Sequence, residues 1–303
     1  MNGIINVLKP PGMTSHDVVH FIRKKLKIKK VGHTGTLDPE AAGVLPVCLG
    51  KATKAVQYIT DKRKKYRTII KFGIHTETYD KYGKIVKEQQ VKKIDIEKLE
   101  YILEDFRGSI KQLPPIYSAI KVDGKKLYQY ALSGEEVEIK EREVNIYSIV
   151  ILGYNNIDEV VLDIECSKGT YIRSICHDIG QKMGCGACMW QLIRTESTPF
   201  HIEEAYTLEE IDRASVEGTI DNILINTDII FKELPSIELK PTAKSAALNG
   251  SPIYGKGTLQ DIELIDEETN ITIYCDSEFL GIGVIKYCSE ENRKYIKIEK
   301  MFV

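Results

Sequence analysis

The chain has 303 residues, of which 43% are hydrophobic, and a formal net charge of −2 at pH 7. This length and content suit one large domain with a buried core plus a smaller one. No run of 18 apolar residues occurs, and the start MNGIINVLKPPG lacks the basic and apolar regions of a signal peptide. We therefore exclude a membrane-spanning or secreted chain and expect a cytoplasmic one.

The charge is distributed unevenly along the chain. Residues 1–75 carry 15 Lys and Arg against four Asp and Glu, a net of +11, which leaves −13 for the remainder. Two blocks, RKKLKIKK (23–30) and KRKKYR (62–67), supply most of this excess. Such clusters are typical of a polyanion contact, but a solvated basic helix face would carry the same charges. Charge alone leaves both interpretations open.

The first predicted elements are a strand and an amphipathic helix. GIINVLKP indicates a strand that ends at Pro10, after which Thr14 or Ser15 caps a helix with one apolar face and one basic face. Residues 64–78 combine β-branched and aromatic residues with partial alternation, which predicts a further strand. A turn is expected at YDKYGK (79–84).

The middle of the chain alternates helical and strand patterns. Apolar spacing predicts a helix over 94–108, with Gly108 as its C-terminal cap. The polar segment 109–142, interrupted by Pro-Pro and Asp-Gly, indicates a projecting insertion. NIYSIVILGY and EVVLDIECSKG predict a hairpin, and TYIRSICHDIGQKMG predicts a helix ended by Gly184.

The C-terminal part has a different pattern. From about Leu239 onward, short strand-like pieces alternate with turn residues, which favours a small β-rich domain. The predicted architecture is α/β, with a large domain over 1–235 that contains the insertion and a small domain over 236–303.

Asp38 lies in the stretch VGHTGTLDPEAAGVLPVCLGKATK (31–54) and admits two interpretations. Asp followed by Pro39 and Glu40 is a good helix start, with the aspartate as N-cap. A cap does not require Gly32 and Gly35 just before it, whereas a loop that a ligand approaches closely does. The residues alone leave a structural cap and a catalytic group open.

Two motifs resemble a phosphate loop and a zinc site, but neither is complete. GVLPVCLGKAT has its glycines six residues apart and lacks the hydroxyl that a phosphate loop places on magnesium. The CGAC at 185–188 has no second close-spaced pair to complete a zinc site. The seven cysteines form an odd, scattered set, so we expect buried thiols, with neither bridges nor a metal.

Arg173 is placed unfavourably for a surface residue. A cation in the first turn of a helix opposes the helix dipole, and Arg173 lies off the apolar stripe. A buried aspartate would compensate it, and the pairing would orient that aspartate and hold it ionised at neutral pH. A surface arginine among polar neighbours is the alternative. Tyr66, within KKYR, is either a core aromatic or a surface on which a base stacks.

Taken together, these stretches resemble the bacterial tRNA pseudouridine synthases that modify uridine 55 in the T arm. The resemblance rests on several blocks in the family's order. They are NVLKPPGMTSHDVV (6–19), VGHTGTLDPEAAGVLPVCLGKATK, KKYRTIIKFGIHTETYDKYGKI (64–85), PPIYSAIKVDGKKLYQYALSGE (114–135), CSKGTYIRSICHDIG (166–180), and GCGA followed by LIRTE.

The resemblance assigns roles to residues that match the family's motifs. It implies that Asp38 is the catalytic aspartate, that Tyr66 lines the uracil pocket and that Arg173 pairs with Asp38. It also implies that His33 packs against RNA and that Leu192 forms an apolar pocket wall. The full set expected to bind substrate or RNA is Lys9, Pro10, His33, Gly35, Thr36, Asp80, Tyr171 and Leu192.

The same resemblance implies the fold and the reaction. A mixed, mostly antiparallel sheet with flanking helices should carry an RNA-gripping insertion, and the tail should resemble PUA modules. The enzyme would isomerise a flipped uridine in the T stem-loop of tRNA, without cofactor, metal or obligatory protein partner, as a monomer. Asp38 could act as a nucleophile or in proton removal. The rivals are a tRNA-binding module without chemistry and a guide-RNA-dependent pseudouridylase.

Overall fold

The computed structural model describes residues 1–303 and contains two large sheets. The larger sheet has nine strands in the order β1-β3-β12-β4-β11-β10-β7, with β2 on β3 and β13 on β12. These are β1 (Gly3–Lys9), β2 (Val31–His33), β3 (Ala42–Leu49), β4 (Lys64–Phe72), β7 (Gly108–Gln112), β10 (Arg142–Tyr154), β11 (Glu159–Cys166), β12 (Ala187–Ser197) and β13 (Phe200–His201). Only the β3–β12 pair is parallel, so the expected mixed, mostly antiparallel sheet is confirmed.

The large sheet is divided at β12. This strand pairs with β4 along its whole length but with β3 only at Ile193 and Arg194. Gly43 permits this close approach, because a Cβ there would lie 2.2 Å from the carbonyl oxygen of Arg194. The rest of that edge of β12 is not paired with β3, and the two halves of the sheet diverge there.

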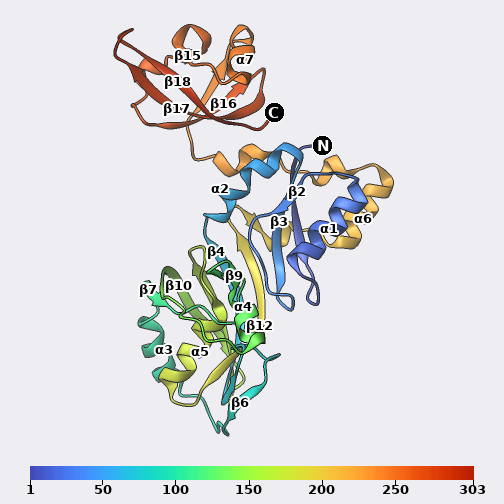
Figure 1. Ribbon diagram of the computed structural model, residues 1–303, viewed down its shortest axis with the longest axis vertical. Helices are drawn as coiled ribbons and strands as arrows, with labels where there is room; N and C mark the ends of the chain where they lie inside the picture. Colours follow the sequence, from blue (N-terminus) through green and yellow to red (C-terminus); the bar gives the residue numbers. More distant parts are fainter.

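Helices cover the two halves separately, as Figure 1 shows. Helices α3 (Ile96–Glu104) and α5 (Ile172–Met183) pack on the half that contains β4, β10 and β11. Helices α1 (Ser15–Leu26) and α6 (Leu208–Glu217) pack together beside β1 and β3. Each fully buried Ile or Leu in these two cores stabilises the fold by about 1.5–3 kcal/mol. The core is therefore built in two blocks that β12 connects.

Local signals account for most helix ends. Thr14 caps α1 in a capping box with Asp17, and Gly184 ends α5 in the left-handed conformation, both as predicted. The predicted cap at Gly108 is wrong, because α3 ends at Glu104 and Gly108 opens β7. Residues 109–112 therefore belong to the sheet. The predicted hairpin is confirmed as β10 and β11.

Residues 113–141 lie outside the large sheet, within the segment expected to project as an insertion. They form a two-stranded ribbon, β8 (Lys121–Val122) with β9 (Lys125–Lys126), and helix α4 (Leu127–Ser133). A second ribbon, β5 (Ile74–Thr76) with β6 (Ile85–Glu88), frames the predicted turn at 79–84. Helix α2 (Val56–Thr60) precedes β4.

The C-terminal part forms its own sheet, which stands at the top of Figure 1. The strand order is β14-β16-β17-β18-β15. The elements are β14 (Ser236–Leu239), α7 (Pro241–Leu248), β15 (Ile253–Tyr254), β16 (Asn270–Cys275), β17 (Glu278–Cys288) and β18 (Arg293–Met301). The β-rich tail is thus confirmed, whereas α7, which begins at Pro241, was not predicted.

The two parts share an apolar contact. Ile282 and Phe302 of the C-terminal part join Ile4, Val44 and Phe231 in one buried cluster. None of the helices has both the length and the apolar composition needed to cross a membrane.

Candidate active site

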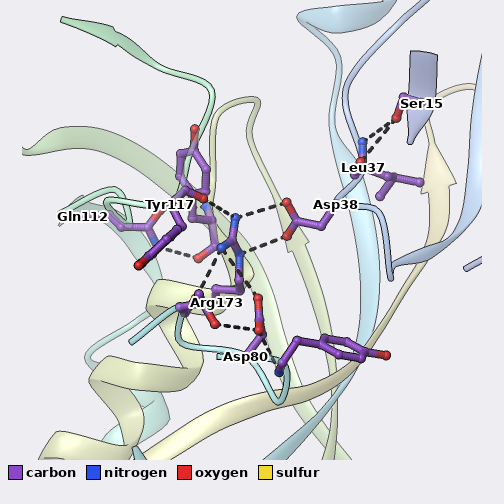
Figure 2. A network of polar contacts seen from close by, with 10 residues as sticks. Ser15, Leu37, Asp38, Asp80, Gln112, Tyr117 and Arg173 are labelled. Carbon is purple, nitrogen blue, oxygen red and sulfur yellow. Dashed lines mark hydrogen bonds and ion pairs between the residues drawn. The ribbon is translucent and has the colours of Figure 1, made fainter. Parts of the chain in front are cut away.

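Asp38 and Arg173 form an ion pair, although 135 residues separate them in the chain. Arg173 Nη2 donates a hydrogen bond to Asp38 Oδ1 at 3.1 Å, and Nε lies 2.9 Å from Oδ2 (Figure 2). The Nε–H is not aimed well enough to hydrogen-bond, so the second contact is electrostatic. The predicted pairing is confirmed. It fixes the direction of the carboxylate.

The backbone around Asp38 excludes the capping alternative. Pro39 and Glu40 form a single turn, closed by a hydrogen bond from Ala41 N to Asp38 O at 3.0 Å. The chain then enters β3 at Ala42 instead of a helix. Asp38 therefore has no helix to cap, and its side chain is free to face Arg173.

A buried lysine, Lys9, is hydrogen-bonded to the backbone on either side of the Asp38 turn. Lys9 is fully buried, and its ammonium donates to the carbonyls of Pro10, Pro39 and Ala41 at 2.8, 2.9 and 2.6 Å. Burial lowers the pKa of Lys9 to about 8. These three bonds leave no free donor, so the RNA contact expected of Lys9 gives way to a role as an internal brace. Ser15 Oγ adds a bond from Leu37 N at 3.0 Å.

Arg173 is held by acceptors from three other segments. Its guanidinium donates to Tyr117 O at 3.1 Å and to Thr78 O at 3.3 Å, and it lies 3.7 Å from Asp80 Oδ2 (Figure 2). Its side chain is only 6% exposed. The helix start is secured by Gln112, whose amide exchanges hydrogen bonds with the backbone of Tyr171 at 2.8 and 3.0 Å. The arginine is thus preorganised.

Asp80 is presented by a tight turn. Its Oδ1 accepts from Thr78 Oγ1 at 2.7 Å and from Tyr82 N at 3.0 Å, which leaves Oδ2 toward Arg173. Gly83 is needed for this turn, because a Cβ there would lie 2.2 Å from Thr78 Oγ1. The turn attaches to the free edge of β12, where Met189 N donates to Tyr79 O at 2.9 Å.

The electrostatics of Asp38 differ from the expectation. Burial raises the pKa of the Asp38 carboxyl above its ordinary value, and the Arg173 guanidinium opposes that shift. The Asp80 carboxylate adds to the rise, because two like charges disfavour ionisation. Arg173 favours the charged form as expected, but burial is the larger influence. The ionisation of Asp38 therefore depends on Arg173 and Asp80 as well as on burial.

Asp38, Asp80 and Arg173 line a cavity of about 590 Å³. Leu192 forms part of its apolar wall, in the place expected from the sequence. Lys81, Tyr82 and Trp190 also belong to its lining. The remaining lining residues are Pro11, Pro39, Glu40, Ala41, Ala42, Thr78, Tyr117, Met189, Gln191 and Ile193. A volume of this size admits a small organic group such as a nucleoside.

The structure places the other expected residues around the cavity without making them part of its lining. Tyr66 packs against the main core from β4, and burial raises its pKa. Tyr171 precedes α5, and Thr36 is exposed just before Leu37. The set of expected residues outside the lining is Lys9, Pro10, His33, Gly35, Thr36, Tyr66 and Tyr171.

His33 and Gly35 belong to the loop that leads to Asp38. The His33 ring meets His16 edge to face at 5.4 Å, and its Nδ1 accepts a hydrogen bond from Gly35 N at 3.3 Å. Burial lowers the pKa of His33 to about 4, so the ring is neutral at pH 7. Gly35 O accepts from Arg194 Nη2 at 3.1 Å, which ties this loop to β12.

Several residues that hold the site are not predicted from the sequence. Tyr117 acts through its backbone carbonyl, and no side-chain pattern reveals that. Arg194 is fully buried and donates to Val44 O and Gly35 O, yet its strand position resembled any alternating polar residue. Gln112 and Trp190 were also missed. For Gln112, the only sequence signal is that a lone polar residue stands at the end of a strand.

The two basic blocks differ in the structure. In the block 62–67, Lys64 is buried, Arg63 pairs with Glu165, and Lys65 and Arg67 share Asp163. In the block 23–30, the exposed side chains without an ionic partner are Arg23, Lys24, Lys27, Lys29 and Lys30. Of the two blocks, the one around α1 therefore carries most of the free positive charge.

Family models and known proteins resemble this chain along its length. A model described as TruB family pseudouridylate synthase (N terminal domain) matches residues 23–172. One described as tRNA pseudouridylate synthase B C-terminal domain matches residues 173–231. The protein named tRNA pseudouridine synthase B from Alkaliphilus oremlandii is 46% identical over 99% of this chain and 98% of its own length. Its namesake from Clostridioides difficile is 46% identical over the whole of both chains.

Chains of two solved complexes have a similar fold. A chain of a Cbf5–Nop10–Gar1 complex aligns with a TM-score of 0.74 and 29% identity. A chain of an H/ACA RNP bound to a substrate RNA containing 2′-deoxyuridine aligns with a TM-score of 0.73 and 27% identity. Both alignments cover 99% of this chain and 85% of the other.

Proposed function

The chain belongs to the TruB family of pseudouridylate synthases, isomerases that act on tRNA, and on this premise we propose that it converts uridine 55 of the T arm to pseudouridine with Asp38 as the catalytic carboxylate. One observation carries the proposal: Asp38, held by Arg173 at 2.9 and 3.1 Å, faces a cavity of nucleoside size. The family sequence blocks quoted above support uridine 55 as the target.

The isomerisation needs a catalytic group at the ribose and no external co-reactant. The bond from ribose C1′ to uracil N1 breaks and a bond from C1′ to C5 forms, while C5 loses a proton and N1 gains one. An ionised Asp38 supports this either as a nucleophile or by stabilising positive charge and taking part in proton removal at the sugar. Arg173 acts as a positioning residue that favours the charged form of the carboxylate and aims it at the cavity.

The target base must leave the RNA stack to enter this cavity. Flipping costs a few kcal/mol, which contacts to the base and to phosphates offset. Leu192 offers an apolar wall for the uracil ring, and Tyr66 lies on β4, packed against the main core. The free lysines around α1 supply the positive potential that draws the tRNA phosphates. Together these features support a flipped uridine as substrate.

We also propose that the protein acts alone on the T stem-loop, as a monomer. The similar Cbf5 chain is part of a complex with Nop10 and Gar1, whereas the full-length relatives carry the name of a single tRNA enzyme. The additional segment 113–141 stands beside the cavity through Tyr117 and would close on the RNA. A division into folding units at residues 1–235 and 236–303 belongs to the same proposal.

The test uses purified full-length protein and an unmodified tRNA transcript. Carbodiimide labelling followed by primer extension should show one stop at position 55, absent from a transcript with cytidine there. Asp38→Asn should lose the stop while binding the transcript, and the exposed Asp221→Asn should retain it. A stop elsewhere would refute the target. Product from Asp38→Asn would remove Asp38 from the chemistry, and loss of binding as well would favour a binding role for it.

A further inference from the structure

The Lys81 ammonium lies close to two aromatic rings and has no ionic partner. Its Nζ lies 5.0 Å from the centre of the Tyr82 ring and 5.8 Å from that of Trp190. No carboxylate lies within 4 Å of it, since Lys81 takes part in none of the ion pairs of the chain. Aromatic faces attract a cation without neutralising its charge. The ammonium is therefore positioned but still free to bind an anion.

The backbone fixes Lys81 beside Trp190. Lys81 N donates to Met189 O at 3.1 Å, and Met189 N donates to Tyr79 O at 2.9 Å. These two bonds add the Asp80 turn to the unpaired edge of β12, with Asp80 beside Met189 in a parallel bridge. The backbone of Lys81 is therefore attached to β12, the strand that carries Leu192, so regular structure fixes its place beside the cavity.

Lys71, the other lysine beside Trp190, differs from Lys81 in having ionic partners. Its ammonium also lies over Trp190, at 4.9 Å, but it pairs with Asp158 at 3.1 Å and with Glu159 at 2.9 Å. Lys71 is therefore neutralised by two carboxylates and adds no free positive charge. Of the two lysines at the indole, only Lys81 retains the capacity to bind an anion.

The charges that line the cavity limit where a phosphate can bind. The lining contains three carboxylates, Asp38, Glu40 and Asp80, and the Arg173 guanidinium already pairs with two of them. A phosphate beside these carboxylates would meet net negative charge. Lys81 is the other cationic residue in the lining, and its ammonium lies by the rings of Tyr82 and Trp190. An RNA strand that places uracil near Asp38 therefore meets its favourable phosphate position at Lys81.

We propose that Lys81, held by Tyr82 and Trp190 at the rim of the cavity, binds the backbone phosphate next to the flipped uridine. This inference rests on the proposed function, because it assumes that an RNA strand enters the cavity. The phosphate contact would anchor the strand that carries the base facing Asp38. Tyr82 and Trp190 act as positioning residues that limit the freedom of the lysine before RNA arrives.

Salt dependence provides the first test. RNA binding is measured with full-length Asp38→Asn protein, which prevents turnover, and with the same protein carrying Lys81→Gln. Loss of one contact to a single-stranded phosphate lowers the slope of log affinity against log salt by about 0.7. Between 50 and 200 mM salt, the parent should then lose about 2.6-fold more affinity than the variant. Lys93→Gln, exposed and outside the cavity lining, should leave the slope unchanged.

A chemical change in the RNA locates the phosphate. A set of stem-loops is prepared, each with one neutral methylphosphonate at a different position around uridine 55. The affinity of each stem-loop is measured for the protein with Lys81 and for Lys81→Gln. At one position next to the uridine, the replacement should cost about tenfold with Lys81, the size expected for one hydrogen bond to a charged group, and nothing further with Lys81→Gln. Equal losses in both proteins at every position would overturn the phosphate site.

The outcomes separate this inference from the proposed function. If wild-type protein forms pseudouridine 55 but Lys81→Gln shows the parental slope and methylphosphonate pattern, the phosphate site is wrong and the function stands. If coupling to Lys81 appears without any product, the function is wrong and the RNA site stands. Trp190→Leu keeps apolar bulk but removes the aromatic face, and it should reproduce part of the Lys81→Gln effect. An unchanged Trp190→Leu would assign the positioning to Tyr82 alone.

Discussion

His177 stacks on Tyr79, with ring centres 3.9 Å apart and planes within 12°. His177 lies one helical turn beyond Arg173 on α5, and Tyr79 directly precedes Asp80. The same helix therefore carries the arginine and holds the turn that presents Asp80 to it. Tyr79 adopts a positive φ of 63°, an uncommon conformation for an aromatic residue, so the turn needs such support.

Removing the stack should affect chemistry more than RNA affinity. His177→Ala is expected to lower kcat several-fold and the free energy of unfolding by about 1 kcal/mol, with KM for tRNA nearly unchanged. The reason is that the ring positions Asp80 and does not face the cavity. Steady-state kinetics and urea unfolding check this. The exposed His20→Ala should preserve stability, and a change in KM alone for His177→Ala would contradict the positioning role.

The neighbours of Asp38 should move the acid limb of the pH profile in opposite directions. Activity requires the ionised carboxylate, whose pKa burial raises, Arg173 lowers and Asp80 raises. Arg173→Gln removes the lowering influence, so activity should be lost at higher pH as the solution is acidified. Asp80→Asn removes a raising influence, so its limb should move to lower pH.

The measurement is kcat/KM from pH 5 to 9 under single-turnover conditions for both variants and the wild type. Arg173→Gln should also reduce kcat by about a hundredfold or more at pH 8, as expected for loss of a preorganised partner. Limbs that move in the same direction would mean that Asp38 is not the titrating group.

The buried lysine should matter for stability. Lys9→Met leaves the carbonyls of Pro10, Pro39 and Ala41 without their donor, and a buried unpaired acceptor costs about 1–3 kcal/mol. Relief from burying a charge offsets part of this loss, so we expect a net destabilisation of about 3 kcal/mol. Urea unfolding monitored by circular dichroism measures it.

The pH dependence of the same variant has a defined sign. Burial lowers the pKa of Lys9 to about 8 in the folded protein, below its ordinary value of 10.5. Between these values the unfolded chain binds more protons, so the wild type gains stability as pH rises and loses it as pH falls toward 8. The difference from Lys9→Met should therefore grow from pH 8 to pH 10.5. A constant difference would show that Lys9 titrates normally.

The free lysines around α1 should dominate the salt dependence of tRNA binding. A combined Lys24→Gln, Lys27→Gln and Lys30→Gln variant should bind more weakly and reduce the slope by about 0.9 for each lysine that contacts a duplex phosphate. Lys65→Gln should have little effect, because Asp163 already partners Lys65. Filter binding from 50 to 300 mM salt checks both. A larger effect for Lys65→Gln would assign the contact to the second block.

The local elements were accessible from sequence because their signals are local. Apolar spacing, the Thr14 cap and the Gly184 end placed α1 and α5 closely, and alternation placed β10 and β11. The end of α3 was misplaced because Gly108 suits the start of β7 as well as a helix end. For the site, Asp38, Arg173, Asp80 and Leu192 followed from motif-dense blocks, and they meet at one cavity.

By itself, the sequence determined several of the helices and strands of the large domain, the family motifs and the chemical types at the site. Only the tertiary structure decided that Asp38 ends a loop instead of starting a helix, and that Lys9 points inward while Lys81 remains unpaired. It also showed that the second basic block is largely neutralised by β11 carboxylates. The physical reason is range: capping and periodicity depend on residues a few positions apart. Burial, ion pairing and the charge of a carboxylate depend on strands and helices that meet only in the folded chain.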